Sequence, residues 1–309
     1  MLVVFFFCVA LLLNTTRGFR PRAPLLSSVV REQSLVLRSG VFLPLVPVAV
    51  APPPVLSSLL PGISLFQEAL LANGLWYIIL YLTKTKALTR AGLLHASVLG
   101  VGLWSFLGFQ GWLVCVSYLV LGVVVTKVKM REKEALGIAE KRGGARGPEN
   151  VWGAAATAMV CAALTGVLPS WSAVLQVGYV ASLATKLSDT FGSEIGKAFG
   201  KTTYLVTTLK PVPRGTEGAV SLEGTLAGVG GSILMVAAGM LFGQLERGSW
   251  PAALACVVAA FVGTTAESFI GASFQGDDKV KWLSNELVNL INTVIGAFVG
   301  MLLYAVLGA

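Results

Sequence analysis

One face of an expected helix at residues 182–197 carries ionisable and hydroxyl side chains spaced three or four positions apart. They are Ser182, Thr185, Lys186, Asp189, Thr190, Ser193, Glu194 and Lys197. An ionisable group at the centre of a bilayer costs about 2.5–3.5 kcal/mol on insertion scales, so such groups usually have a function. Carboxylates here could hold Mg²⁺ and lysines could bind phosphates. The structural alternative is a pair of internal salt bridges, Lys186 with Asp189 and Glu194 with Lys197.

A basic loop follows this helix at residues 201–218. Pro211 and Pro213 exclude a helix, whereas Gly215 and Gly218 allow tight turns with exposed amides. The loop is chemically suited to phosphate binding, although it lacks the G-x-x-x-x-G-K-[ST] order of a Walker A loop. Its positive charge comes from Lys201, Lys210 and Arg214.

Further acids and amides are expected at the same membrane face. We expect Glu217 and Glu223 to enter the next helix, whose N-terminus favours a bound anion. Glu267 lies in a later apolar segment. The acids and cations together suggest phosphoryl or nucleotidyl transfer assisted by Mg²⁺. Three amides begin the last segment, Asn285, Asn289 and Asn292. A polar stripe between helices explains them as well as a functional role does.

The chain that must position these residues has the composition of a membrane protein. Of its 309 residues, 55% are hydrophobic and 12% are charged, against about 45–50% and about 25% in soluble domains. The mean hydropathy is +0.78. We therefore exclude an ordinary soluble enzyme and predict an all-α fold, a polytopic transmembrane helical bundle. Gly192, Gly196 and Gly200, each four apart, predict a stripe that lets another helix approach closely.

The apolar segments predict seven or eight membrane spans, each about 17–25 residues long. They are residues 66–83, 91–109, 111–126, 151–167, 172–196, 219–243 and 251–273, with 287–307 as an eighth. Basic loops alternate with short, nearly uncharged turns, as the positive-inside rule describes. We therefore expect four basic loops on one face of the membrane, at residues 84–90, 127–146, 197–214 and 279–281.

Charge and metal-ligand counts exclude other classes of protein. The net charge is +8, but five arginines and one glutamate in residues 1–38 supply half of it. Nucleic acid is therefore a poor candidate for a partner. The four cysteines are isolated and His95 is the only histidine, which excludes zinc sites and thiol chemistry. The apolar neighbours of His95 favour a hydrogen-bonded packing role.

The N-terminal segment has the pattern of a two-part targeting leader. Residues 1–18 are expected to be a signal peptide, with Thr16 and Gly18 at its cleavage site. Residues 19–50 carry serines, arginines and a single acid, as transit peptides do. This order resembles the bipartite presequences of algae with secondary plastids, in which a phenylalanine such as Phe19 follows the signal. A plain secretory signal or an N-terminal anchor is the alternative.

A long motif resembles a known membrane family. Residues 188–197 read S-D-T-F-G-S-E-I-G-K, and residues 204–225 read Y-L-V-T-T-L-K-P-V-P-R-G-T-E-G-A-V-S-L-E-G-T. Both closely resemble the integral-membrane family that includes plant chloroplast phytyl-phosphate kinase, as do residues 266–268 and 282–286. The resemblance covers about residues 70–307 and identifies residues 66–309 as a transmembrane kinase domain in a plastid membrane.

The resemblance implies a reaction that fits the residues. The γ-phosphoryl group of CTP or another nucleoside triphosphate would pass to phytyl phosphate, giving phytyl diphosphate for tocopherol and phylloquinone synthesis. A phosphate monoester is already anionic, so its attack needs little proton transfer and no histidine base. The task is to bring two polyanions together, which metal ions and cations can do.

These considerations give each candidate residue an expected role. We expect Asp189 and Glu194 to hold Mg²⁺, and Glu217 and Glu223 to complete or orient that site. Lys210 and Arg214 would bind the transferred phosphoryl group. The remaining phosphate, nucleotide and substrate contacts are expected from Lys197, Lys201, Gly215, Ser221, Glu267, Asn285 and Asn289. The isoprenoid tail would lie in the apolar space between helices.

Two other classes of function also fit membrane acids beside basic loops. One is a related lipid enzyme, either a polyprenol or phytol kinase or a cytidylyltransferase that makes a CDP-lipid. The other is a secondary transporter, because buried acids, a lysine and glycine-interrupted helices also form ion pathways. Transporters commonly have two related halves, and the motif at 188–225 has no internal repeat in this chain.

Overall fold

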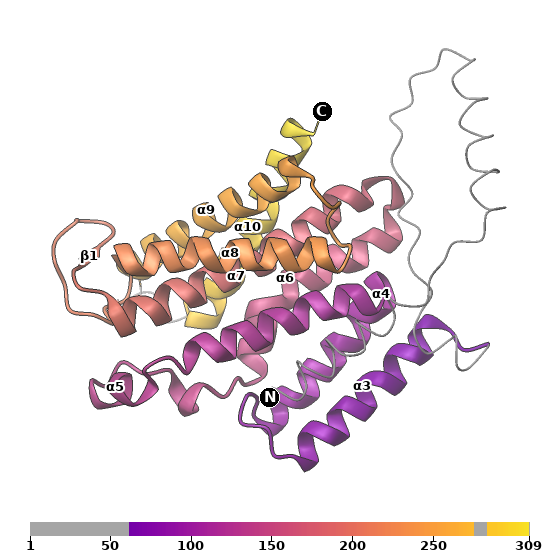
Figure 1. Cartoon of the computed structure of the whole chain (residues 1–309), viewed down its shortest axis with the longest axis horizontal. Helices are drawn as coiled ribbons and strands as arrows, with labels where there is room; N and C mark the ends of the chain where they lie inside the picture. Colours follow the sequence, from indigo (N-terminus) through magenta and orange to yellow (C-terminus); the bar gives the residue numbers. More distant parts are fainter. Residues whose placement is uncertain (1–61, 275–282, 309) are drawn as a thin grey trace. The chain divides into compact units, whose positions relative to one another are not determined.

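The computed structural model describes residues 62–274 and 283–308 as a helical bundle (Figure 1). The predicted leader at residues 1–50, and Lys279 and Lys281 of the fourth basic loop, lie outside the described residues. By length and composition, six of the described helices could cross a membrane. They are α3 (Leu65–Leu82), α4 (Arg90–Thr126), α6 (Pro148–Val167), α8 (Leu222–Leu241), α9 (Trp250–Phe274) and α10 (Asn285–Leu307).

Helix α4 is two antiparallel arms, because Gly108 has non-helical backbone angles, φ 70° and ψ −177°. The rings of Trp104 and Trp112 lie 5.4 Å apart. A Cβ atom on Gly100 would lie 2.9 Å from the indole nitrogen of Trp112, whereas twelve residues of straight helix extend about 18 Å. The arms correspond to the predicted spans 91–109 and 111–126. Each predicted span is found as a helix, but the helix at the predicted span 172–196 is not among the six that could cross a membrane by length and composition.

Helix α7 (Ser172–Phe199) is the central element of the bundle and packs against α4, α6, α8, α9 and α10. Every residue from Val177 to Thr190 is buried, so the charged face of this helix points into protein and not into lipid. The glycine stripe predicted on α7 faces α8. A Cβ atom on Gly224 of α8 would lie 2.6 Å from the carbonyl oxygen of Gly192, and the backbones therefore touch directly.

The described basic loops meet at one end of the bundle, as predicted. Leu88 pairs with Arg146, joining the first loop to the second. The second loop contains α5 (Met130–Ala135) and the 3₁₀ helix η1 (Lys141–Gly144). A further 3₁₀ helix, η2 (Pro169–Trp171), lies in the uncharged turn before α7. Figure 1 shows α5 and β1 at the same end of α7.

The third basic loop is an antiparallel ribbon of β1 (Thr203–Leu205) and β2 (Ala219–Ser221). The prediction that Glu217 enters the next helix is wrong, because Glu217 lies before β2 and α8 begins only at Leu222. Gly218, with φ 70°, turns the chain between Glu217 and the strand. The predicted all-α bundle is confirmed, and this ribbon is the sheet found among the described residues.

Candidate functional site

A buried ion pair from the charged face of α7 forms the centre of the site. The amine of Lys186 donates hydrogen bonds to the carboxylate of Asp189 and, at 2.7 Å, to the side-chain oxygen of Asn289 on α10. The backbone carbonyl of Lys186 also accepts the hydroxyl of Thr190, at 2.8 Å. All four residues are buried. The predicted residues Asp189 and Asn289, 100 positions apart, are therefore held together by a shared lysine.

Glu267 of α9 adds a second carboxyl group to this pair. It interacts directly with Asp189, and the charges of Lys186 and Glu217 also act on it. The loop that carries Glu217 reaches α9, since a Cβ atom on Gly218 would lie 2.6 Å from the carbonyl oxygen of Ser268. We call Lys186, Asp189, Glu267 and Asn289 the inner cluster. The cluster brings together side chains from α7, α9 and α10.

Two glycines allow α9 and α10 to come this close to α7. Gly263 of α9 and Gly296 of α10 both lie against Thr185, one residue before the cluster lysine. A side chain on Gly296 would overlap the Thr185 hydroxyl, which donates to the carbonyl oxygen of Ala181 at 2.7 Å. The small residues thus determine how deeply the helices that carry Glu267 and Asn289 can pack.

Replacing Gly296 with valine is therefore expected to destabilise the bundle by about 1–3 kcal/mol, the usual cost of overpacking. Thermal unfolding in detergent would measure the loss as a lower midpoint. Gly230→Val on α8 is the matched control, because no atom outside the local helix backbone lies within 4 Å of a Cβ placed there. Equal midpoints for the two variants would show that the close packing at Thr185 contributes nothing to stability.

Glu194 and Asp189 have different partners, although both are on α7. Five positions along a helix correspond to a rotation of about 140°, so the two carboxylates leave α7 in different directions. Glu194 forms a buried ion pair with Lys133 of α5, and its second oxygen lies 4.0 Å from the amine of Lys197. Within residues 62–274 and 283–308, no three His, Cys, Asp or Glu side chains gather as a ready metal site. The structure therefore does not bring together the pair predicted to hold Mg²⁺.

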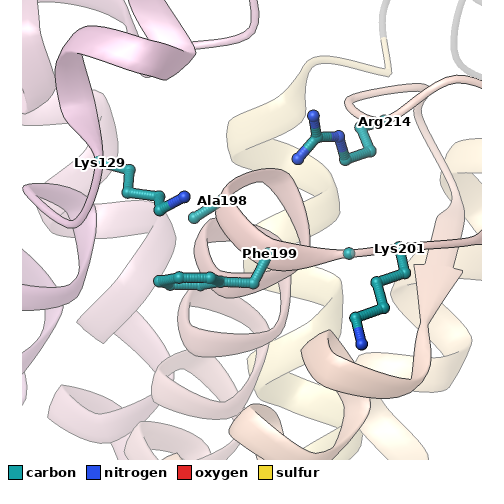
Figure 2. A pocket seen from close by; sticks show the side chains of 6 residues that line it. Lys129, Ala198, Phe199, Lys201 and Arg214 are labelled. Carbon is teal, nitrogen blue, oxygen red and sulfur yellow. The ribbon is translucent and has the colours of Figure 1, made fainter.

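A basic hollow of about 450 Å³ lies at the end of α7. Lys201 and Arg214 line it from the segment after α7, and Lys129 lines it from the second basic loop, on the other side of Phe199 (Figure 2). The rest of its lining is Ala198, Phe199 and Gly200. None of the described lining residues is acidic. The hollow is thus suited to an anion and contains two of the cations predicted to bind phosphate.

Other predicted residues hold the backbone around this hollow. The hydroxyl of Ser221 caps α8 by accepting the Gly224 amide at 3.1 Å. Glu223 accepts the Lys201 amide at 3.4 Å and so ties the start of the ribbon to α8. Gly215 adopts φ 85° where the loop turns against Ile138. Ser221, Glu223 and Gly215 therefore shape the loop that carries Arg214.

Three predicted residues belong neither to the inner cluster nor to the lining of the basic hollow: Lys197, Lys210 and Asn285. Lys197 offers its backbone carbonyl to Arg214 at 3.5 Å, while its amine faces Glu194. Lys210 is exposed on the ribbon, where its carbonyl accepts the amide of Leu205 at 3.0 Å. Asn285 is exposed at the first turn of α10. All three are at the same end of the bundle as the inner cluster.

Four residues at the site did not emerge as candidates from the sequence. In the sequence, Lys129 and Lys133 are two cations of a basic loop that the positive-inside rule accounts for. Arg146 donates a hydrogen bond to the hydroxyl of Tyr118, and its guanidinium lies 5.2 Å from the ring centroid. Tyr118 in turn interacts with Lys186. Cations of a basic loop look alike in sequence, so only their burial and partners distinguish these residues.

The inner cluster and the basic hollow are neighbours along α7. Asp189 and Ala198 are nine residues apart, about 13 Å of helix. The loop after α7 connects the two groups, because Arg214 lines the hollow while Glu217, three residues later, acts on Glu267. Carboxylates that can hold a divalent cation thus lie beside amines and a guanidinium that can hold phosphates.

Comparison with known proteins gives consistent matches over this region. The family profile described as integral membrane protein DUF92 matches residues 74–297. A membrane protein of Synechocystis, sll0875, is 49% identical over 235 residues, covering 76% of this chain and 89% of that protein. Protein VTE6, chloroplastic, of Arabidopsis thaliana is 44% identical over 241 residues, covering 77% and 72%. Membrane protein MJ0933 of Methanocaldococcus jannaschii is 34% identical over 228 residues, covering 74% and 90%. No solved structure matches.

Proposed function

The chain belongs to the DUF92 family of integral membrane proteins, and from this we propose that it is a membrane kinase of the phytyl-phosphate kinase type. It would transfer the γ-phosphoryl group of a nucleoside triphosphate, such as CTP, to phytyl phosphate. One observation carries the proposal: two interacting acids, the buried Asp189 and the half-buried Glu267, lie beside a basic hollow at one end of α7. The similarity to a chloroplast relative supports a plastid membrane, and the role in tocopherol synthesis follows from the motif resemblance alone.

Mg²⁺ would be held by Asp189 and Glu267. Magnesium in phosphoryl-transfer sites commonly takes one or two carboxylates and completes its shell with water and substrate phosphates. Two carboxylates that interact directly therefore suffice, and a third protein ligand is not needed. Glu267 takes the place that the sequence assigned to Glu194, whose carboxylate is already paired with Lys133. The bound ion would neutralise charge on the phosphates during transfer.

The chain's own cations would hold the phosphates. Lys201 and Arg214 line the hollow and would bind the nucleotide, and Glu223 keeps the Lys201 backbone in place. Lys186 donates to the Asp189 carboxylate and so fixes its orientation, and Asn289 holds the Lys186 amine in place. Lys210 and Asn285, exposed at the same end, would meet the substrates at the membrane surface. The acceptor tail would lie along apolar helix faces, where Leu226 and Phe298 are each 63% exposed.

A labelled-nucleotide assay tests this proposal against its rivals. Purified protein is incubated with phytol or phytyl phosphate and with nucleotide labelled in the α or γ position. Transfer of γ-label to phytyl phosphate supports the proposal. Transfer of γ-label to phytol would instead identify an alcohol kinase, and a product carrying α-label would identify a cytidylyltransferase. Ion or substrate flux into vesicles without any label transfer would identify a transporter.

Replacing Arg214 with lysine is expected to raise the KM for the nucleotide about tenfold. Lysine keeps the charge but loses the planar guanidinium that binds phosphate oxygens in pairs, and a tenfold change corresponds to about 1.4 kcal/mol. Arg131→Lys is the matched control, because Arg131 is exposed on α5 and does not line the hollow. Steady-state kinetics with varied nucleotide would measure both. An unchanged KM in the Arg214 variant would remove Arg214 from the phosphate site.

A further inference from the structure

We infer that Lys129 is a third cation for a polyphosphate and that the buried Lys133–Glu194 ion pair is the device that positions it. The inference deepens the proposed function, because it specifies which part of the substrate the basic hollow takes and what keeps the hollow formed. It also assigns to Glu194 a positioning role in place of metal binding.

Helix α5 has little to hold it in place except Lys133. It is six residues long, and Lys133 is its only buried residue. A helix this short is not stable in water on its own, so a tertiary contact must fix it. The amine of Lys133 donates to the Glu194 carboxylate on α7 and, at 2.9 Å, to the carbonyl oxygen of Thr126 at the end of α4. One lysine therefore ties α5 to two long helices.

The ion pair is almost completely shielded from water. The side chains of Lys133 and Glu194 are 1% and 3% exposed. A charge buried to this extent needs its partner, because removing one member leaves the other uncompensated in a low-dielectric interior. Segment 127–138 has a second, apolar contact, at Ile138, against which Gly215 of the ribbon loop packs. The segment thus contacts both α7 and the loop that carries Arg214.

Positioning Lys133 also positions Lys129, one helical turn earlier. Lys129 is the residue before α5 and has a left-handed backbone, φ 46°. Its amine lies 4.7 Å from the ring centroid of Phe199, at the end of α7, and 3.0 Å from the carboxylate of Glu132. Glu132 is 63% exposed, so this surface pair is weak and can yield to a stronger anion. Figure 2 shows Lys129 and Arg214 on different sides of the hollow.

The charge and size of the hollow favour a polyphosphate over a single phosphate group. Two of its three cations, Lys201 and Arg214, come from the loop after α7, and Lys129 comes from the second basic loop. A phosphate monoester carries about −1.5 to −2 at pH 7, so three cations match a chain of phosphates better. The volume of about 450 Å³ is also within the range of small-molecule sites. The ligand class is a soluble triphosphate, the part of the nucleotide that all nucleoside triphosphates share.

The test measures anion binding without turnover. Calorimetry on the full chain in phosphatidylcholine nanodiscs, titrated with inorganic tripolyphosphate, should show binding that Lys129→Ala weakens about tenfold. Lys133→Met should weaken it to a similar extent, although Lys133 does not line the hollow. Lys133→Arg keeps the charge and should restore most of the affinity. Lys86→Met is the matched control, an exposed cation of the first basic loop outside the hollow, and should bind as the parent protein does.

A proteolysis measurement separates positioning from general unfolding. Trypsin cleavage after the exposed Arg131 should become faster in Lys133→Met and in Glu194→Gln, and tripolyphosphate should slow it in the parent protein. The thermal midpoint of each variant monitors the rest of the bundle. If Lys133→Met does not fold, the exchanged pair Lys133→Glu with Glu194→Lys should restore both the slow cleavage and the binding.

Several outcomes would overturn the inference. The parent protein could fail to bind tripolyphosphate, or Lys129→Ala and Lys133→Met could bind it within twofold of the parent. Equal competition by orthophosphate, or by phosphatidic acid in the nanodisc, would show a site for one phosphate group or for a lipid headgroup. Tripolyphosphate binding that depends on Lys129 and Lys133, in a protein without label transfer, would support this inference and reject the proposed kinase.

Discussion

Asparagine in place of Asp189 is expected to lower the turnover number at least about 100-fold, while the protein still inserts and folds. Asparagine keeps the size and can still accept the hydrogen bond from Lys186, but it removes the negative charge that would hold Mg²⁺. Removing one preorganised electrostatic contact in an active site commonly costs 10²–10³ in turnover. The measurement is transfer of γ-label to phytyl phosphate over a range of Mg²⁺ concentrations. The apparent affinity for Mg²⁺ should fall together with the turnover number.

The control for this experiment separates lost chemistry from lost folding. Glu140→Gln removes one exposed carboxylate from the second basic loop and should leave turnover unchanged. Asp189→Asn breaks the buried ion pair with Lys186, and breaking such a pair by removing one partner can cost about 3–5 kcal/mol. The double variant Asp189→Asn with Lys186→Met also removes the lysine charge, so it should recover stability and stay inactive. Full turnover in Asp189→Asn would exclude Asp189 from the metal site.

Replacing Glu267 with glutamine is expected to have a comparable effect, with turnover reduced about 100-fold and a higher Mg²⁺ requirement. The reason is geometric: Glu267 is the carboxyl group that interacts with Asp189, although it comes from another helix. Glu194→Gln is the informative comparison, because Glu194 is paired with Lys133. We expect that variant to act mainly through a higher KM for the nucleotide.

The contrast between these variants tests the assignment of the metal ligands. Mg²⁺ titrations of both variants, at saturating nucleotide, would measure it directly. Loss of Mg²⁺ dependence in Glu194→Gln, together with normal behaviour of Glu267→Gln, would return the metal to the pair expected from the sequence. Thermal midpoints should be measured alongside, since Glu194 also anchors α5.

Much of the fold could be predicted from the sequence because a bilayer imposes simple constraints. A span needs about twenty apolar residues, and its backbone must satisfy its own hydrogen bonds. The predicted spans therefore match the helices closely, including the two arms of α4 that meet at Gly108. The sidedness of the described loops could also be predicted, since cations cluster on one face. The boundary between the third loop and α8 was predicted wrongly, because Gly218 turns the chain before α8 and leaves Glu217 outside the helix.

The motif at residues 188–225 determined the family and pointed to the end of α7 where the inner cluster and the basic hollow lie. On the same helix face, charges three residues apart could be paired from the sequence in one case, Lys186 with Asp189. The sequence contains no comparable rule for partners on different elements. Asn289 is 103 positions from Lys186 and Glu194 is 61 positions from Lys133. Such contacts depend on how closely the helices pack against one another. Glycines such as Gly296 allow close packing.

The sequence by itself determined the membrane class, the spans, the face that carries the basic loops, and the helix that carries the charges. Only the tertiary structure decided which acids are partners: Asp189 with Glu267 of α9, and Glu194 with Lys133 of α5. It also distinguished Lys129 and Lys133 from the other cations of their loop. The physical reason is that periodicity records the face of one helix, whereas a site is made where faces of several helices meet, and burial and distance exist only after packing.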